Sequence, residues 1–189
     1  MDPAMRKEAA FAEALEPRLR NIYSYFRRLG VDAASAEDLA QETLLLAWQN
    51  LSSLRDETKL KGWLYRIAYR CFLKHRTRRP QATVEIPEKL PGAAMYDPGS
   101  DERLVMRVAH QALLTLPPKH LHALALVYWE GLSYAEAARV LSVPVGTLAW
   151  RVHKALKLAK RALAEKEAED EVTIRGPQAS RAVDGLDES

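Results

Sequence analysis

The chain has 189 residues, of which 48% are hydrophobic and 28% are charged, as is typical of a soluble globular protein with an ordinary core. No apolar run approaches the roughly 18 to 20 residues that span a bilayer, and the N-terminus lacks the basic start and apolar core of a secretory signal. The single cysteine, Cys71, excludes an internal disulfide and lies among apolar neighbours, as expected of a small buried hydrophobe. We therefore expect a cytoplasmic protein that does not insert into a membrane.

The net charge of +3 is unevenly distributed along the chain. Residues 1–80 carry +5, residues 81–100 carry −2, residues 101–164 carry +5 and residues 165–189 carry −5. Two basic blocks favour nucleic acid as a partner, because neutralised phosphates supply most of the non-specific affinity. The alternative is a pair of solvated lysine-rich faces. The position of the charges along each helix distinguishes this alternative from nucleic-acid binding.

Helical periodicity dominates residues 1–79. Apolar side chains step by three and four along the first expected helix: Phe11, Leu15, Leu19, Ile22, Phe26 and Leu29. Gly30 is expected to end this helix. Ser35 stands three residues before Asp38, which resembles a capping box that opens a second helix running to about Gln49. With a third helix after a polar loop, residues 1–79 are predicted to form a small all-α domain.

The third helix is expected over about residues 60–78, and the stretch 61–79 carries seven Lys or Arg residues and no acid. Basic residues recur at every fourth position along one side, and two tyrosines stand next to them: Arg66, Arg70, Lys74 and Arg78, with Tyr65 and Tyr69. This pattern suits a strand with unstacked bases, because cations hold phosphate and aromatic rings receive bases. The alternative is a solvated face with half-buried tyrosines, but four like charges at this spacing repel one another and favour a polyanion.

The amino-acid composition changes between residues 80 and 100, where four prolines and two glycines exclude a regular helix and predict a flexible linker. Helical periodicity returns over residues 101–164, where a second small all-α domain is expected. Residues 165–189 are acidic and then rich in Gly, Ser and Asp, and a disordered tail is expected there.

Within the second domain, Pro118 is expected to open a helix that Gly131 ends, and Ser133 with Glu136 forms a capping box for the next. The last helix, from about Val145 to Ala164, completes a helix-turn-helix with a basic second helix. Several of its side chains lie off the apolar stripe and are candidates for DNA contact: Thr147, Trp150, Arg151, Lys154 and Lys157. An ordinary helical hairpin is the alternative, and the matching basic first domain favours DNA.

Residues 36–48 place Asp38, Gln41 and Glu42 on a helix whose other side is rich in leucine. From the residues alone this is a capped amphipathic core helix. No catalytic or metal-binding constellation is visible, since the five histidines lack Cys or carboxylate partners at ligand spacing and a glycine-rich phosphate loop is missing. We therefore expect no enzyme activity, no metal and no cofactor.

The motifs "DLAQETLLLAW" and "GWLYRIAYRCFLKHRTRR", a Pro-rich linker and "ALLTLPPKHLHALALVYWEGLSYAEAARVLSVPVGTLAWRVHKAL" occur in that order. Over roughly residues 10–163 the chain closely resembles the extracytoplasmic-function sigma factors of bacteria. The resemblance implies an all-α fold with a sigma region 2-like domain and a helix-turn-helix sigma region 4-like domain. It departs from frequent family residues at Arg70, Lys74, Ser142 and the Ala149-Trp150 pair.

The resemblance also implies roles for the candidate residues. Asp38, Gln41 and Glu42 match the helix that docks on core RNA polymerase. The loop 50–60 and the basic helix after it match the part that reads the minus-ten element as single strand. The second domain matches the part that reads the minus-thirty-five element of promoter DNA as duplex, and an anti-sigma factor commonly restrains such proteins. The alternative is a stand-alone helix-turn-helix regulator that binds duplex DNA.

Overall fold

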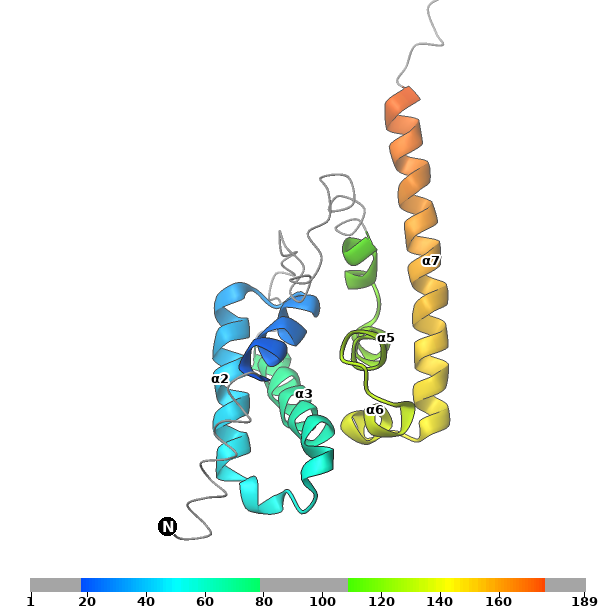
Figure 1. The fold of residues 1–189 in the computed structure, drawn as a ribbon. Helices are drawn as coiled ribbons and strands as arrows, with labels where there is room; N and C mark the ends of the chain where they lie inside the picture. Colours follow the sequence, from blue (N-terminus) through cyan, green and yellow to red (C-terminus); the bar gives the residue numbers. More distant parts are fainter. Residues whose placement is uncertain (1–17, 79–108, 176–189) are drawn as a thin grey trace, which may run out of the picture.

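The computed structural model describes residues 18–78 and 109–175, with side chains as far as Glu165, and every regular element within these residues is helical (Figure 1). The expected all-α class is confirmed. The predicted linker over residues 80–100 lies outside the described residues. Among those that are described, no helix is long and apolar enough to cross a membrane.

Within residues 18–78, the first domain contains three α-helices. The first covers residues 18–28 and gives way to a turn at Gly30, whose φ of 80° suits glycine. Helix α2 (Ala33–Gln49) and helix α3 (Leu60–Arg78) follow, and the end of α2 and both ends of α3 agree with the sequence prediction. Between them the expected polar loop forms two short 3₁₀ turns, η1 (Leu51–Ser53) and η2 (Glu57–Lys59).

The expected cap of α2 was wrong. Asp32, not Ser35, is the N-cap, and its Oδ1 accepts a hydrogen bond of 2.9 Å from the backbone N–H of Ser35. Asp is among the best N-cap residues, and the bond lowers the pKa of the Asp32 carboxyl. Ser35 itself is buried in the first turn.

The second domain contains residues 109–114, which are helical, followed by α5 (Pro118–Leu124), η3 (Ala125–Trp129), α6 (Tyr134–Leu141) and α7 (Val145–Arg175). Pro118 lies in the first turn of α5, as predicted. The segment η3 is π-helical, and Gly131 with a φ of 63° follows it.

The helix-turn-helix is formed by α6 and α7. Its predicted capping box is confirmed, because the Ser133 side chain accepts from the Glu136 N–H while Glu136 accepts from the Ser133 N–H. The turn after α6 places Ser142 in the left-handed region at φ 54°. Helix α7 extends to Arg175 rather than ending near Ala164, so the segment expected to be disordered begins as helix. Residues 176–189 lie outside the described residues.

The two domains pack side by side (Figure 1). Helix α3 of the first domain lies against α6 of the second, and buried side chains from both halves form one continuous hydrophobic core. The sequence predicts two separate domains but contains no direct signal of this contact. Its consequence is that surfaces of α3 are shared between solvent and the second domain.

Candidate nucleic-acid interface

The basic row predicted on α3 lies on the surface. Arg66, Arg70, Lys74 and Arg78 are all exposed. Lys74 Nζ bonds Glu42 Oε1 of α2 at 2.9 Å, and both side chains of this pair are partly exposed to solvent. The structure therefore brings together one residue expected to contact DNA and one expected to contact polymerase.

The two tyrosines beside this row lie differently from the basic residues. Tyr65 is buried, and its hydroxyl donates to Glu130 Oε2 of the second domain. Tyr69 is half-buried, and its ring meets the His122 ring edge-on at a centroid distance of 5.0 Å. Burial raises the pKa of both tyrosines, and the Glu130 carboxylate raises that of Tyr65 further. In this arrangement the Tyr65 ring is covered by protein and does not face a strand.

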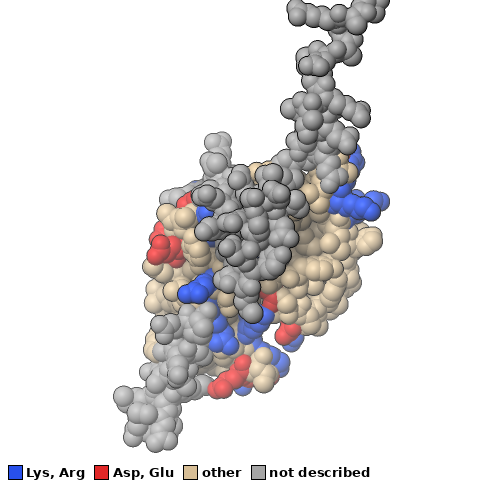
Figure 2. Space-filling model, turned by 45° about the horizontal axis from the view of Figure 1, so that its top comes forward, with Lys and Arg blue, Asp and Glu red and all other residues tan. Residues whose placement is uncertain are grey.

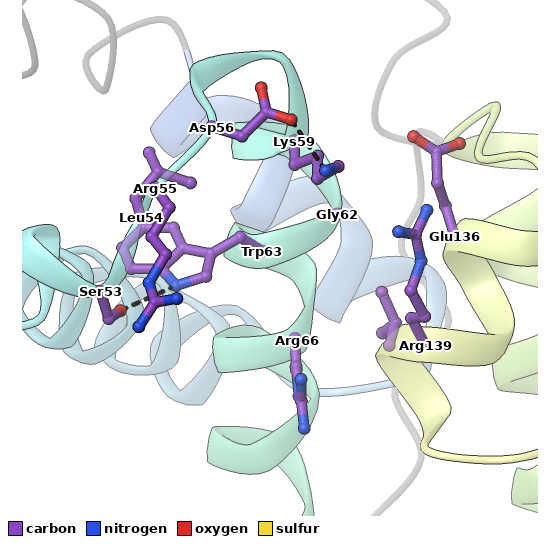
Figure 3. A pocket seen from close by; sticks show the side chains of 11 residues that line it. Ser53, Leu54, Arg55, Asp56, Lys59, Gly62, Trp63, Arg66, Glu136 and Arg139 are labelled. Atoms are coloured by element: carbon purple, nitrogen blue, oxygen red, sulfur yellow. Dashed lines mark hydrogen bonds and ion pairs between the residues drawn. The ribbon is translucent and has the colours of Figure 1, made fainter.

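A pocket of about 270 Å³ lies where α3 faces α6 (Figure 3). The loop 51–59 and the start of α3 form one wall, where the Trp63 Nε1–H donates to Ser53 Oγ at 3.2 Å and Asp56 pairs with Lys59 at 2.8 Å. Side chains of α6 form the opposite wall. The residues on the two sides are Ser53, Leu54, Arg55, Asp56, Lys59, Gly62, Trp63 and Arg66, facing Glu136, Arg139 and Val140.

The predicted recognition helix exposes a polar and aromatic face. Trp150, Lys154 and Lys157 are exposed, while Thr147 and Arg151 are half-buried. The opposite face of α7 is buried through Leu148, Val152, Ala155 and Ala159. Figure 2 shows Lys and Arg side chains in separate groups on the molecule, with acidic side chains close to the central group.

Trp150 leaves 54% of its surface exposed near the start of α7. Its ring centroid lies 5.4 Å from that of His120 on α5, and His120 Nδ1 lies 3.2 Å from the carbonyl oxygen of Arg151. The ring contact of Trp150 in the structure is therefore with α5. Half of the indole thus packs on the domain and half is open to a partner.

Helix α2 presents the candidate polymerase contacts. Asp38 and Gln41 are exposed and Glu42 is half-buried, while Leu39, Ala40, Thr43 and Ala47 face the core. Two large apolar side chains of the same helix, Leu45 at 57% and Trp48 at 43%, are also exposed. The sequence prediction missed them because the run Leu44-Leu45-Leu46 hides which leucine faces outward.

The sequence also gave no role to the residues that join the two domains. Glu130, His122 and His110 are buried in the second domain, and each bonds a residue of the first. The signal was present in Glu130, an acid directly after the apolar stretch of η3. Over the part of the chain that the structure covers, no group of three or more His, Cys, Asp or Glu residues could hold a metal ion.

Comparisons with known proteins place these features in a family. Residues 14–80 match Sigma-70 region 2, and residues 106–158 match Sigma-70 region 4. The RNA polymerase sigma-H factor of Pseudomonas aeruginosa is 37% identical over 144 residues, which cover 70% of this chain and 75% of that protein. The ECF RNA polymerase sigma factor SigL of Mycobacterium tuberculosis is 30% identical over 166 residues, covering 86% of this chain and 94% of that protein.

A solved structure shares the fold. The sigma factor RpoE of Bartonella quintana, crystallised with the anti-sigma factor NepR, superposes with a TM-score of 0.68 at 24% identity, over 82% of this chain and 97% of that chain. The order of a region 2 domain and a region 4 domain agrees with the all-α helices and the helix-turn-helix described above. The chain belongs to the extracytoplasmic-function sigma factors of RNA polymerase.

Proposed function

We propose that this protein binds core RNA polymerase and directs it to promoters, reading the minus-ten element as a single strand and the minus-thirty-five element as duplex. The observation that carries the proposal is the placement of exposed basic residues on α3 of the region 2 domain and on α7 of the region 4 domain. The proposed role is one of binding, exercised in the cytoplasm, and leaves phosphodiester chemistry to the polymerase.

The proposed polymerase contact is the exposed side of α2. Asp38 and Glu42 are four residues apart and Gln41 is three from Asp38, so the three polar side chains share one helix face. The exposed Leu45 and Trp48 extend the surface with apolar area, which interfaces commonly combine with polar contacts.

The proposed promoter contacts fall on both domains. Arg66, Arg70, Lys74 and Arg78 would hold the phosphates of the opened strand, with Tyr69 at the edge of the row. On α7, Trp150 with Arg151 would meet base edges, and Lys154 and Lys157 would position the helix on phosphates. An anti-sigma factor is a proposed further partner, supported by the complex of the similar RpoE with NepR.

Affinity for core polymerase in the absence of DNA tests the proposal. The full-length protein should bind core polymerase in solution and bind promoter duplex poorly by itself. Reversing both charges, Asp38→Lys with Glu42→Lys, should cost several kcal/mol of that affinity if both acids are paired at the interface. The matched control is Glu37→Lys, another exposed acid of α2 outside the proposed set.

If the folded double variant binds core polymerase as tightly as wild type, α2 is not the docking surface. Tight binding to promoter duplex with no affinity for core polymerase would instead identify a stand-alone regulator and overturn the proposed function.

A further inference from the structure

A buried histidine lies where α5 packs against α7, the proposed recognition helix (Figure 1). His120 leaves only 3% of its surface exposed. It stands in the first turn of α5, where its backbone N–H donates to the carbonyl oxygen of Pro117 at 2.8 Å. Pro118 begins this helix, and its ring fixes the backbone angle φ of the first turn. The backbone of His120 therefore has a well-defined place beside α7.

The His120 side chain is bonded to the backbone of α7. Its Nδ1 lies 3.2 Å from the carbonyl oxygen of Arg151. A carbonyl oxygen only accepts, so Nδ1 carries the hydrogen of this bond. The bond restricts rotation of the imidazole ring. It also joins α5 to α7 directly beside Trp150, the residue that precedes Arg151.

The same imidazole ring supports the indole of Trp150. The two ring centroids are 5.4 Å apart and the ring planes are tilted by 55°. Aromatic pairs favour centroid separations of about 4.5 to 7 Å with offset or tilted planes, so the contact is attractive. Trp150 nevertheless leaves 54% of its surface exposed. One part of the indole is thus held by α5, and another part remains open to a partner.

This support matters for recognition because a free side chain has to be ordered when it binds. Exposed side chains change rotamer within picoseconds to nanoseconds, and fixing one rotamer at an interface costs affinity. A ring that already rests on His120 has lost part of that freedom before DNA arrives. The reading of base edges by Trp150 therefore depends on a residue of α5, outside the helix-turn-helix that α6 and α7 form.

We propose that His120 is a positioning residue for promoter recognition, which holds the Trp150 ring in the orientation that reads one base pair of the minus-thirty-five element. The proposal rests on the proposed function, in which Trp150 meets base edges. His120 is buried and does not itself contact DNA, so its effect on base preference passes through Trp150. Lys154 and Lys157 differ from it, because both are exposed and would reach phosphates directly.

Two substitutions in the full-length protein separate the ring of His120 from its hydrogen bond. In His120→Gln the side-chain amide can still donate to the Arg151 carbonyl, but no ring supports Trp150. In His120→Phe a ring remains and the donor is lost. His75→Gln is the matched control, because it makes the same substitution on α3 of the other domain.

The readout is the base preference of the polymerase complex at each position of the minus-thirty-five element. The probes are duplexes that carry the element shared by the promoters from which wild type initiates in vitro, each changed at one base pair. We expect His120→Gln to reduce the preference by about threefold to tenfold at the base pair where Trp150→Ser also reduces it. His120→Phe and His75→Gln should retain the wild-type preference.

A double-variant cycle distinguishes positioning from a purely structural role. In the Trp150→Ser background, His120→Gln should have no further effect on base preference, because the side chain through which His120 acts is missing. An equal loss in both backgrounds would overturn the proposal, and so would an unchanged preference in His120→Gln. His120→Leu, which also removes the ring, takes its place in the cycle if His120→Gln does not fold.

Fluorine NMR of protein labelled with fluorinated tryptophan tests the ring contact without DNA. The Trp150 resonance is identified by its absence from the Trp150→Ser variant, and the dispersion of the other three tryptophan resonances reports the folded state. His120→Gln should shift the Trp150 resonance, and an unshifted resonance would overturn the proposal. If the resonance shifts but Trp150→Ser alters no base preference, the proposed role of Trp150 fails, and the positioning role of His120 fails with it.

Discussion

Arg28 and Glu130 lie 102 positions apart in the chain, yet Arg28 Nη1 approaches Glu130 Oε1 to 2.9 Å in a largely buried contact between the two domains. Burial raises the pKa of the Glu130 carboxyl, while Tyr65, Arg28 and Lys61 act in the opposite direction. An ionised Glu130 is therefore tolerated only because these partners surround it. The same guanidinium lies 5.7 Å above the Trp129 ring, which gives it a second partner in the second domain.

Removing the Glu130 carboxylate should strongly lower the stability of the folded protein. Glu130→Ala leaves Arg28 and Tyr65 without their acceptor in a buried place, and we expect the free energy of unfolding to fall by about 3 kcal/mol. Urea denaturation measures the change, and a double-variant cycle with Arg28→Ala gives the coupling between the two side chains.

Lys74→Ala is the control for that experiment. It breaks the exposed Lys74–Glu42 pair and should cost about 0 to 1 kcal/mol. A cost of Glu130→Ala no larger than that of Lys74→Ala would contradict the description of Glu130 as a buried interdomain anchor.

Lowering the pH should reduce the stability of the folded protein through protonation of His122. Burial, helped by the charge of Arg76, lowers the pKa of His122 to about 3, whereas an unfolded histidine titrates at about 6.5. The folded state therefore resists protonation, so its full stability is present above about pH 6.5 and is lost as the pH falls toward 3. Between about pH 7.5 and about pH 5.5, we expect His122 to account for a loss of about 1 kcal/mol.

His122→Gln isolates this contribution. Glutamine can still bond the Tyr25 hydroxyl but does not titrate, so stability of the variant should depend less on pH over the same range. Denaturation curves at both pH values decide the matter, and identical pH dependence in the two proteins would show that His122 is not the responsible group.

Much of the fold follows from local sequence signals. Gly30, Pro118 and the Ser133–Glu136 box mark helix ends that the structure confirms, because such ends depend on neighbours within four residues. The cap at Asp32 was missed because two candidate caps stand close together, and only geometry separates them. The Glu130–Arg28 contact could not be foreseen, since periodicity says which face is apolar but not which distant acid meets it. Tyr65 illustrates the same limit, because its neighbours on α3 do not show that the second domain covers its ring.

The turn of the helix-turn-helix offers a stabilising substitution. Ser142 adopts a φ of 54°, a conformation that costs a residue with a Cβ about 1 kcal/mol and costs glycine little. We expect Ser142→Gly to raise the free energy of unfolding by up to about 1 kcal/mol, measured by urea denaturation. Ser142→Ala keeps the Cβ and should bring no such gain. Equal effects of glycine and alanine would exclude backbone strain as the cause.

Trp150 is proposed to read the minus-thirty-five element with the exposed half of its ring. Trp150→Ser should weaken binding of the cognate duplex by roughly 1 to 3 kcal/mol, and single base-pair changes should matter less to the variant than to wild type. Binding isotherms on a set of duplexes that differ at one position, measured with the polymerase complex, give both quantities.

Leu156→Ser is the matched control, because Leu156 is an apolar residue of α7 that is 43% exposed but lies on another side of the helix. It should leave base preference unchanged. If Trp150→Ser lowers the melting temperature but preserves base preference, the ring serves packing against His120 instead.

The basic row of α3 should contribute to the salt dependence of the affinity for promoter DNA. If Arg70 and Lys74 contact phosphates of the opened strand, replacing each by alanine should reduce the slope of log affinity against log salt by about 0.7. Lys119→Ala, at an exposed position of α5, should leave the slope unchanged. Equal slopes for wild type and the Arg70→Ala, Lys74→Ala double variant would show that this row is a solvated face.

The most direct measurement is the sequencing of transcripts made in vitro by core polymerase with and without this protein on genomic DNA. We expect a new set of start sites in its presence, preceded by two shared sequence elements about 25 base pairs apart. The Asp38→Lys, Glu42→Lys variant should lose these starts. Identical start sites with and without the protein would contradict the assignment of this chain as a promoter-directing subunit.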